Sequence, residues 1–377
     1  MATATVVRPG VRKLPDVRRS SEDRIPRILS IGTSVPPNCF TQQEAYRMAG
    51  YESQRILEIF LNSDIDTRHF YVDPAHANPH ETPDELNQRY LRGALEIGRQ
   101  AIENCLHHAS FGVRDVDLLV TCTCTGYVCP DVGTRLMAQM GFRSDTERAP
   151  LTGLGCAGAL PTLQRASDYA RAHPGRTALM LCVEICSAAY FIDNSLETVV
   201  GNAICGDGAA AFLLSTSSPL RGPIEPQIEA RSRYPEVVDF ESYLDPEQLD
   251  KVGFEQRDGK LRIILAALIR DLAAPMIEKS LDPLLARNGL ARSDIRFWVA
   301  HPGGRKVIDN VQRQMGLTDD QLRFSKTVMR GYGNMSSPTV MFVLDEVVRQ
   351  GDPRPGDWGV MIALGPGMAA ETALLRW

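Results

Sequence analysis

Cys156 is the residue whose surroundings most clearly suggest chemistry, because it lies among glycines where an apolar segment turns into a helix. The segment 153–158 reads GLGCAG, and residues 157–170 have the pattern of a helix. Glycines let a backbone turn sharply and approach a ligand closely. At the positive end of a helix dipole, a cysteine is favoured as the nucleophilic thiolate. The competing interpretation is a buried cysteine that acts only as a small apolar side chain.

Two further side chains complete a candidate catalytic set. His301 ends a predicted strand in WVAHPGG, a position where site residues gather, whereas the other histidines lie in polar stretches or late in a helix. An imidazole beside a thiol can accept its proton and leave a thiolate–imidazolium pair. Asn334, in GYGNMSS, adds an uncharged donor, so that two donors suit the enolate oxygen of a bound thioester. Spacing alone leaves acyl condensation and thioester hydrolysis open.

An internal repeat indicates how these residues come together. The segment 112–121 resembles 289–300, and residues 179–181 resemble 360–362. Asp115 and Asp294, like Cys156 and Asn334, stand about 180 positions apart, which is the signature of a duplicated unit. If two similar halves pack about a pseudo-twofold axis, Cys156 and Asn334 face one central cavity.

Strands that alternate with helices predict an α/β layered fold. Buried strands are expected at 27–32, 118–122, 177–184 and 209–215. Helices are expected near 41–50 and 131–140. A capping box with proline at the first helical position starts another helix at Thr82.

Length and composition set the broad class. The 377 residues suggest two domains or one duplicated unit, with halves at 27–225 and 226–377 after a basic tail at 1–26. We expect this tail to be solvated, with an arm that contacts a partner as the alternative. A net charge of -5 gives no reason to expect nucleic acid as a partner.

The cysteines and the apolar runs favour a reducing cytoplasm. There are nine cysteines, and the sequence contains no C-x-x-C, no signal peptide and no apolar run of membrane length. None of the cysteine spacings is typical of structural zinc, so no metal site is expected.

Five motifs, in order along the chain, resemble the type III polyketide synthases, the family of chalcone and stilbene synthases. They are LGCAGALP around Cys156, VVGNAICGDGAAA at 199–211, WVAHPGG around His301, GYGNMSS around Asn334 and ALGPG at 363–367. The resemblance runs from about residue 28 to the C-terminus. The alternative is ketoacyl-ACP synthase III, a related condensing enzyme. Its histidine and asparagine lie in motifs of different sequence.

This resemblance implies a thiolase-like αβαβα fold with internal duplication, a homodimer, and malonyl-CoA and acyl-CoA substrates with no metal or organic cofactor. Cys156 would take the starter acyl group from CoA, and its own N–H would belong to the oxyanion hole. His301 and Asn334 would bind the malonyl thioester carbonyl as CO2 leaves, and the enolate would attack the acyl-cysteine. Repeated extension and cyclisation would follow.

The implied substrate pocket departs from the plant enzymes. Cys205 and Ile263 match two bulky gate phenylalanines, Cys124, Cys186 and Ala189 match starter-pocket threonines, and Leu364 matches another phenylalanine; Cys129 and Ser336 complete the implied set. Smaller or more apolar side chains enlarge the site and remove hydrogen bonds. We therefore expect a long-chain fatty acyl starter and an alkylpyrone or alkylresorcinol product. The alternatives are a malonyl or small aromatic starter, with the cysteines serving only as core packing.

Three basic residues are candidates for CoA binding. Arg68 is retained from a family segment that is usually richer in basic residues, although Asp64 and Asp66 intrude. Arg305 and Lys306 lie just inside a predicted helix N-terminus and could hold a phosphate by charge and dipole together. The alternative is an exposed basic turn. A further possibility is a scaffold that binds acyl-CoA without catalysis. The presence of all three residues, Cys156, His301 and Asn334, argues against it.

Overall fold

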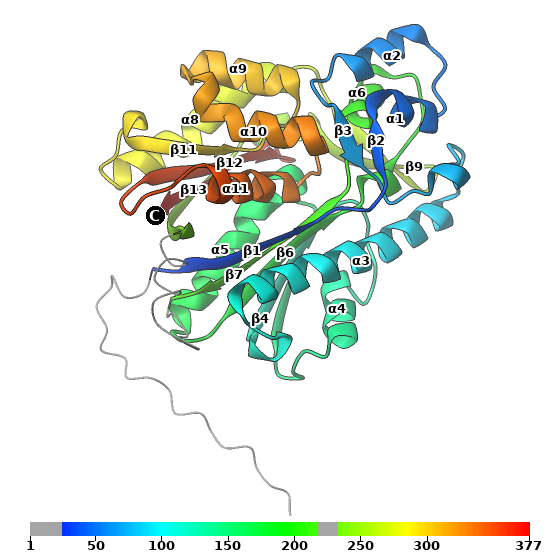
Figure 1. Cartoon of the computed structure of the whole chain (residues 1–377). Coiled ribbons are helices and arrows are strands. Elements are labelled where there is room, and N and C mark those ends of the chain that lie inside the picture. Colours follow the sequence, from blue (N-terminus) through cyan, green and yellow to red (C-terminus); the bar gives the residue numbers. More distant parts are fainter. Residues whose placement is uncertain (1–24, 217–232) are drawn as a thin grey trace, which may run out of the picture.

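The computed structural model describes residues 25–216 and 233–377 (Figure 1). The basic tail, except for its last two residues, and the predicted boundary between the halves at 225/226 therefore lie outside the described residues. Within the described ranges, no helix is long and apolar enough to cross a membrane.

A duplicated sheet forms the framework of the molecule. In the part of the chain that the structure describes, nine strands are ordered β11-β12-β13-β8-β1-β7-β6-β4-β5. Apart from β5, the order is symmetric about the junction of β1 and β8: β4-β6-β7-β1 on one side corresponds to β11-β12-β13-β8 on the other. The two sides meet through a single registered pair, Arg27 with Glu236. This symmetry is the structural form of the internal repeat.

The strands of the first half are β1 (Arg27–Ser34), β4 (Leu118–Thr123), β5 (Glu147–Thr152), β6 (Ala178–Glu184) and β7 (Gly208–Ser215). Those of the second half are β8 (Glu236–Leu244), β11 (Ile295–Ala300), β12 (Trp358–Gly365) and β13 (Ala369–Arg376). Two short pairs lie outside this sheet: β2 (Cys39–Thr41) with β3 (Thr67–His69), and β9 (Val252–Arg257) with β10 (Lys260–Leu265). The four predicted strands are confirmed to within two residues at each end.

The helices are α1 (Gln42–Met48), α2 (Gln54–Leu61), α3 (Pro83–Ala109), α4 (Val132–Met140), α5 (Ala159–Ala172), α6 (Leu196–Ile204), α8 (Ile269–Arg287), α9 (Arg305–Met315), α10 (Asp319–Tyr332) and α11 (Pro338–Gln350). The capping box predicted at Thr82 is present, since its side chain accepts from the Glu85 N–H and Glu85 returns a bond to the Thr82 backbone.

Layering follows from which helices contact which strands. Helices α5 and α11 pack between the two sides of the sheet, α3 covers the outer face of the first half, and α8 covers that of the second (Figure 1). Small and apolar side chains allow α5 and α11 to be buried on most of their surface. Gly158, just before α5, has no room for a Cβ, which would lie 2.5 Å from Cys122 Sγ. The fold is the αβαβα arrangement of thiolase-like proteins.

Matching turns mark the same point in each half. Val113–Asp115 and Arg292–Asp294 are single 3-10 turns that follow a long helix and precede β4 and β11. In the first, the Asp115 carboxylate accepts from the Gly112 N–H at 2.9 Å, and in the second Asp294 accepts from Ala291 at 2.8 Å. The paired aspartates of the repeat therefore cap equivalent turns.

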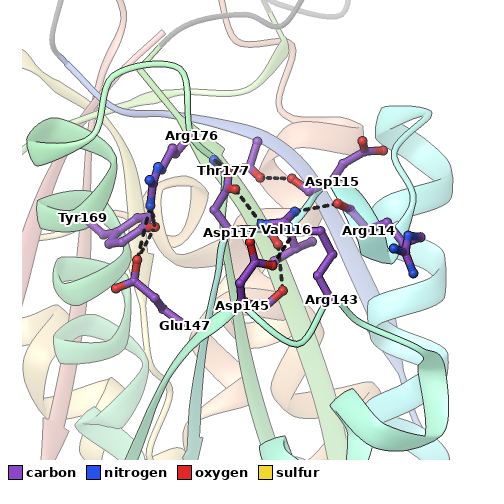
Figure 2. A network of polar contacts seen from close by, with 11 residues as sticks. Arg114, Asp115, Val116, Asp117, Arg143, Asp145, Glu147, Tyr169, Arg176 and Thr177 are labelled. Carbon is purple, nitrogen blue, oxygen red and sulfur yellow. Dashed lines mark hydrogen bonds and ion pairs between the residues drawn. The ribbon is translucent and has the colours of Figure 1, made fainter. Parts of the chain in front are cut away.

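A polar network joins the N-terminal ends of β4, β5 and β6 (Figure 2). Asp117 accepts from the Thr177 N–H at 3.0 Å and from Arg143 at 2.9 Å. Beside it, Glu147 accepts from the Tyr169 hydroxyl at 2.9 Å. Because these three strands are parallel, a shared register at this end aligns their carboxyl ends at the opposite edge, where Cys156 follows β5.

Candidate active site

Cys156 lies in the 3-10 turn Gly155–Gly158 between β5 and α5. The turn requires glycine at 155, whose φ is +55° and whose Cβ, if present, would lie 2.5 Å from Pro366 Cδ. Pro366 belongs to the turn that follows β12, so the segment carrying the thiol packs directly against the second half. The predicted helix after Cys156 is present, but it begins only at Ala159.

Asn334 is placed beside Cys156 by the segment that precedes α11. Its Oδ1 lies 3.8 Å from Cys156 Sγ and accepts from the Ser336 N–H at 2.8 Å. Its Nδ2 donates to the Gly303 carbonyl at 3.2 Å, which leaves the second amide hydrogen for another acceptor. The sequence prediction that the repeat brings positions 156 and 334 together agrees with this contact.

His301 directly follows β11, and its backbone N–H donates to the Ile362 carbonyl at 2.8 Å. Both ring nitrogens are shielded from solvent and have no hydrogen-bond partner among the described residues. Burial lowers the pKa of this imidazole to about 4. The ring is therefore neutral near pH 7 and keeps both nitrogens available to a ligand.

The thiolate predicted at Cys156 is not the form that its surroundings favour. Burial raises the pKa of the Cys156 thiol to about 12, against a smaller opposite effect of its hydrogen bonds with Ser336 and Asn334. Desolvation outweighs the helix dipole here, partly because α5 begins three residues after the cysteine. The Cys156 thiol and the His301 imidazole are therefore both neutral before the reaction. The thiol must lose its proton as its sulfur attacks the acyl group.

Glu184, which sequence reasoning missed, connects the two halves beneath the site. Its carboxylate is fully buried at the end of β6 and accepts from the Cys124 N–H at 2.9 Å, from the Thr125 hydroxyl at 2.9 Å and from the Ser337 hydroxyl at 2.8 Å. Burial raises its pKa. One signal was available in the sequence: a charged residue closes the otherwise apolar strand 178–184.

Four of the predicted pocket residues share one cavity: Cys186, Ala189, Cys205 and Ile263. The cavity holds about 210 Å³ of empty space, part of it open to solvent. Its walls come from the turn Cys186–Ala189, the end of α6 and the β9–β10 hairpin. Residues at the end of a strand, in a helix and in a hairpin are thus brought together.

The other four pocket candidates divide between the catalytic set and positions away from it. Cys124 Sγ lies 3.4 Å from the Ser336 hydroxyl, and Ser336 in turn bonds to Cys156. Cys129 is exposed on the loop before α4. Leu364 packs in β12 against a cluster that includes Met368. Neither Cys129 nor Leu364 lines the cavity, because the loop faces outward and the strand side chain is part of the packing.

The three basic candidates for CoA binding lie in different environments. Arg305 begins α9 with a partly exposed side chain whose Nε lies 3.9 Å from Asp64, and Lys306 beside it is exposed. Arg68 is fully buried, and its Nη1 donates to the carbonyls of Asn202 and Cys205 at 2.7 and 2.8 Å. The CoA contact predicted for Arg68 is therefore corrected: this side chain holds the wall of the cavity from inside.

Comparison with known families agrees with the fold. Residues 41–251 match the model described as FAE1/Type III polyketide synthase-like protein, and residues 248–377 match the chalcone and stilbene synthases, C-terminal domain. The chain belongs to the type III polyketide synthases, decarboxylative condensing enzymes that transfer acyl groups and use malonyl-CoA and acyl-CoA substrates.

Individual relatives cover nearly the whole chain. A 3,5-dihydroxyphenylacetyl-CoA synthase from Streptomyces toyocaensis is 34% identical over 93% of this chain and 90% of its own length. A 1,3,6,8-tetrahydroxynaphthalene synthase from Streptomyces peucetius subsp. caesius is 32% identical over 96% and 95%. The crystal structure of PKS-I from the brown alga Ectocarpus siliculosus superposes with a TM-score of 0.83 at 28% identity, covering 93% of this chain and 98% of that one.

Proposed function

We propose that Cys156 carries the acyl chain in this polyketide synthase and that His301 and Asn334 bind the thioester carbonyl of malonyl-CoA. The observation that supports this most directly is the convergence of the two halves. Asn334 contacts the Cys156 thiol, and His301, at the end of β11, has two ring nitrogens that bond to none of the described residues. Such donors stabilise negative charge best in a site from which water is excluded.

The neutral resting state defines the order of events. As the Cys156 sulfur attacks the carbonyl of acyl-CoA, its proton passes to the imidazole of His301, and CoA leaves as the thioester forms. Malonyl-CoA then loses CO2, and donors from His301 and Asn334 stabilise the enolate oxygen. The enolate carbon attacks the acyl-cysteine carbonyl, the C–S bond to Cys156 breaks, and the Cys156 sulfur leaves. The chain, now two carbons longer, is a thioester of CoA. This sequence needs no metal and no organic cofactor.

For the starter we propose a long-chain fatty acyl group, which leads to an alkylpyrone or alkylresorcinol. The support is the apolar character and small size of Cys186, Ala189 and Cys205 in the cavity wall. The empty space between its walls is about 210 Å³, including the part that is open to solvent. Tyr190 separates this cavity from a second hollow, lined partly by Leu86. A chain of ten or more carbons would therefore displace Tyr190.

The names of the relatives favour a second candidate, a malonyl or small aromatic starter. Both of the relatives described above are named for compact aromatic products. The hydroxyl of Tyr190 donates to the Asn202 carbonyl at 2.8 Å, a bond that keeps the cavity short. With this bond intact, the cavity suits a short acyl chain.

The CoA moiety and the second subunit are further parts of the proposal. Arg305 and Lys306 lie at the exposed start of α9, where charge and helix dipole both favour a phosphate. Strand β5 ends the sheet and, among the described strands, pairs only with β4. Most of its residues are exposed, so it offers an edge to a second copy of the chain. A homodimer with continuous sheets would cover this edge. We place the enzyme in the cytoplasm, consistent with its free thiols.

Incubation with labelled malonyl-CoA and a panel of starters tests both levels of the proposal. The wild type should release CO2 and form extended products, and Cys156→Ala should form neither products nor an acyl-protein adduct. Free acid without extension would instead identify a hydrolase, and no turnover would identify a scaffold. The long-chain starter is refuted if short aromatic or malonyl starters are extended far faster than acyl-CoAs of about ten or more carbons.

A further inference from the structure

Cys186 and Cys205 form a second pair of thiols that the proposed condensation does not use. Both line the cavity beside Tyr190, Cys186 from the 3-10 turn after β6 and Cys205 at the end of α6. The two thiols share a hydrogen bond, so their sulfur atoms are neighbours. Cys205 as a residue is partly exposed, and the cavity that both side chains line is partly open to solvent, which gives a small molecule a route to the pair.

A buried cation lies behind this pair. Arg68 is fully buried between the rings of Phe60 and Phe70, with its guanidinium carbon 5.4 and 5.0 Å from the ring centroids. Its Nη1 donates to the Cys205 carbonyl, whereas Nε and Nη2 have no hydrogen-bond partner among the described residues. The groups whose negative charge would stabilise it include Cys205 and Asp207. A buried charge with no bonded carboxylate favours an anion close by.

The environment makes the two thiols unequal. The hydrogen bond from Cys186 lowers the pKa of the Cys205 thiol, and the charge of Arg68 acts in the same direction against the effect of burial. The same hydrogen bond and burial raise the pKa of Cys186. The bond between the thiols and the charge of Arg68 thus favour a negative charge on Cys205 over one on Cys186. A low-pKa thiol beside a resolving thiol is the arrangement of redox-active cysteines.

We propose that Cys186 and Cys205 are an oxidisable dithiol, which a hydroperoxide converts to a disulfide across the cavity wall. The Cys205 thiolate attacks one oxygen of the hydroperoxide, the O–O bond breaks, and the other oxygen leaves as an alcohol, or as water from hydrogen peroxide. Cys205 is then a sulfenic acid. The Cys186 thiol loses its proton and attacks the Cys205 sulfur, the S–S bond forms, and water leaves. Two thiols are oxidised by two electrons and the hydroperoxide is reduced.

The chain contains a matched pair for comparison. Cys122 and Cys182 lie in register on the parallel strands β4 and β6, and their thiols also share a hydrogen bond. Both are completely buried, however, and the charge that acts on Cys182 is the carboxylate of Glu184. This pair has the same sulfur contact without the cavity or the cation, so we expect it to resist oxidation.

Peptide mapping after treatment with hydrogen peroxide tests the proposal without any activity measurement. The full-length protein is treated with one equivalent at pH 7, alkylated under denaturing conditions without reductant, and cut after glutamate. Cleavage at Glu184 and Glu197 separates peptides 185–197 and 198–229, each with one of the two cysteines, since Pro226 blocks cleavage after Glu225. We expect a dithiothreitol-sensitive cross-link between them, on the order of tenfold more abundant than any link between Cys122 and Cys182.

Variants of the pair keep the experiment decisive. Cys186→Ser should abolish the cross-link and leave a sulfenic acid on Cys205 that dimedone traps, whereas Cys122→Ser should leave the cross-link intact. The proposal is overturned if Cys186 and Cys205 remain fully alkylatable after peroxide, if Cys156 is the only oxidised cysteine, or if the two pairs cross-link equally. None of these readouts depends on the starter or on turnover, so the outcome is separate from that of the proposed function.

Discussion

Gly201 in α6 provides a sharp test of how the cavity is built. A Cβ at this position would lie 2.5 Å from Ile263 Cγ2 and 3.0 Å from its Cδ1. Carbon atoms in contact prefer about 3.5–4.0 Å, so Ile263 on the β9–β10 hairpin would have to move by roughly 1 Å or more. Substituting alanine for a helical glycine ordinarily stabilises by about 0.5–1 kcal/mol. Overpacking costs about 1–3 kcal/mol, so we expect Gly201→Ala to lose up to about 2 kcal/mol.

A double-mutant cycle isolates the contact. Ile263→Ala removes Cγ2 and Cδ1 and leaves only the Ile263 Cβ, which would lie at 3.5 Å from the new methyl group. In that background Gly201→Ala should stabilise by about 0.5–1 kcal/mol, which gives a coupling energy of roughly 1–3 kcal/mol. Urea unfolding at one fixed protomer concentration measures all four proteins. Equal stabilisation by Gly201→Ala in both backgrounds would refute the packing argument.

Three other perturbations follow from the structure. Burial holds the pKa of His301 at about 4, below its ordinary value of 6.5. As the pH drops from about 6.5 toward 4, the unfolded state binds the proton before the folded state does, so the free energy of unfolding should fall. In unfolding titrations, His301→Gln should reduce this pH dependence by up to roughly 1.4 kcal/mol per pH unit. Asp117→Ala removes the acceptor for the Thr177 N–H, so urea unfolding should show a loss of about 1–3 kcal/mol, and a loss below 0.5 kcal/mol would contradict the role of the network in Figure 2. Replacing both Arg305 and Lys306 by alanine should raise KM for malonyl-CoA about tenfold with little change in kcat, and an unchanged KM would remove them from the CoA site.

Much of the architecture was predictable because it depends on patterns along the chain. The strands at 118–122 and 177–184 are apolar runs, and the helix that begins after Thr82 has an explicit capping box. The repeat predicted a common cavity for positions 156 and 334, and the structure has Cys156 Sγ and Asn334 Oδ1 3.8 Å apart. Motifs also identified the family, since they keep residue type and order together.

The hairpin β9–β10 shows what local signals could have added. Asp258 and Gly259 connect the two strands, both with positive φ, and Asp-Gly is a strong hairpin signal. Recognising it would have placed Ile263 on a strand that packs against α6. Its contact with Gly201, however, joins residues about 60 positions apart, and only the fold determines it.

The sequence by itself determined the family, the duplicated α/β fold and the three candidate catalytic residues. Only the tertiary structure decided their chemical state, because desolvation depends on which distant segments cover a group. Cys156 and His301 are neutral because burial disfavours both charged forms. Burial likewise changes Arg68 from a candidate surface contact into an interior cation next to Cys205. Spacing along a chain records which groups are present, whereas their ionisation depends on the three-dimensional environment that surrounds them.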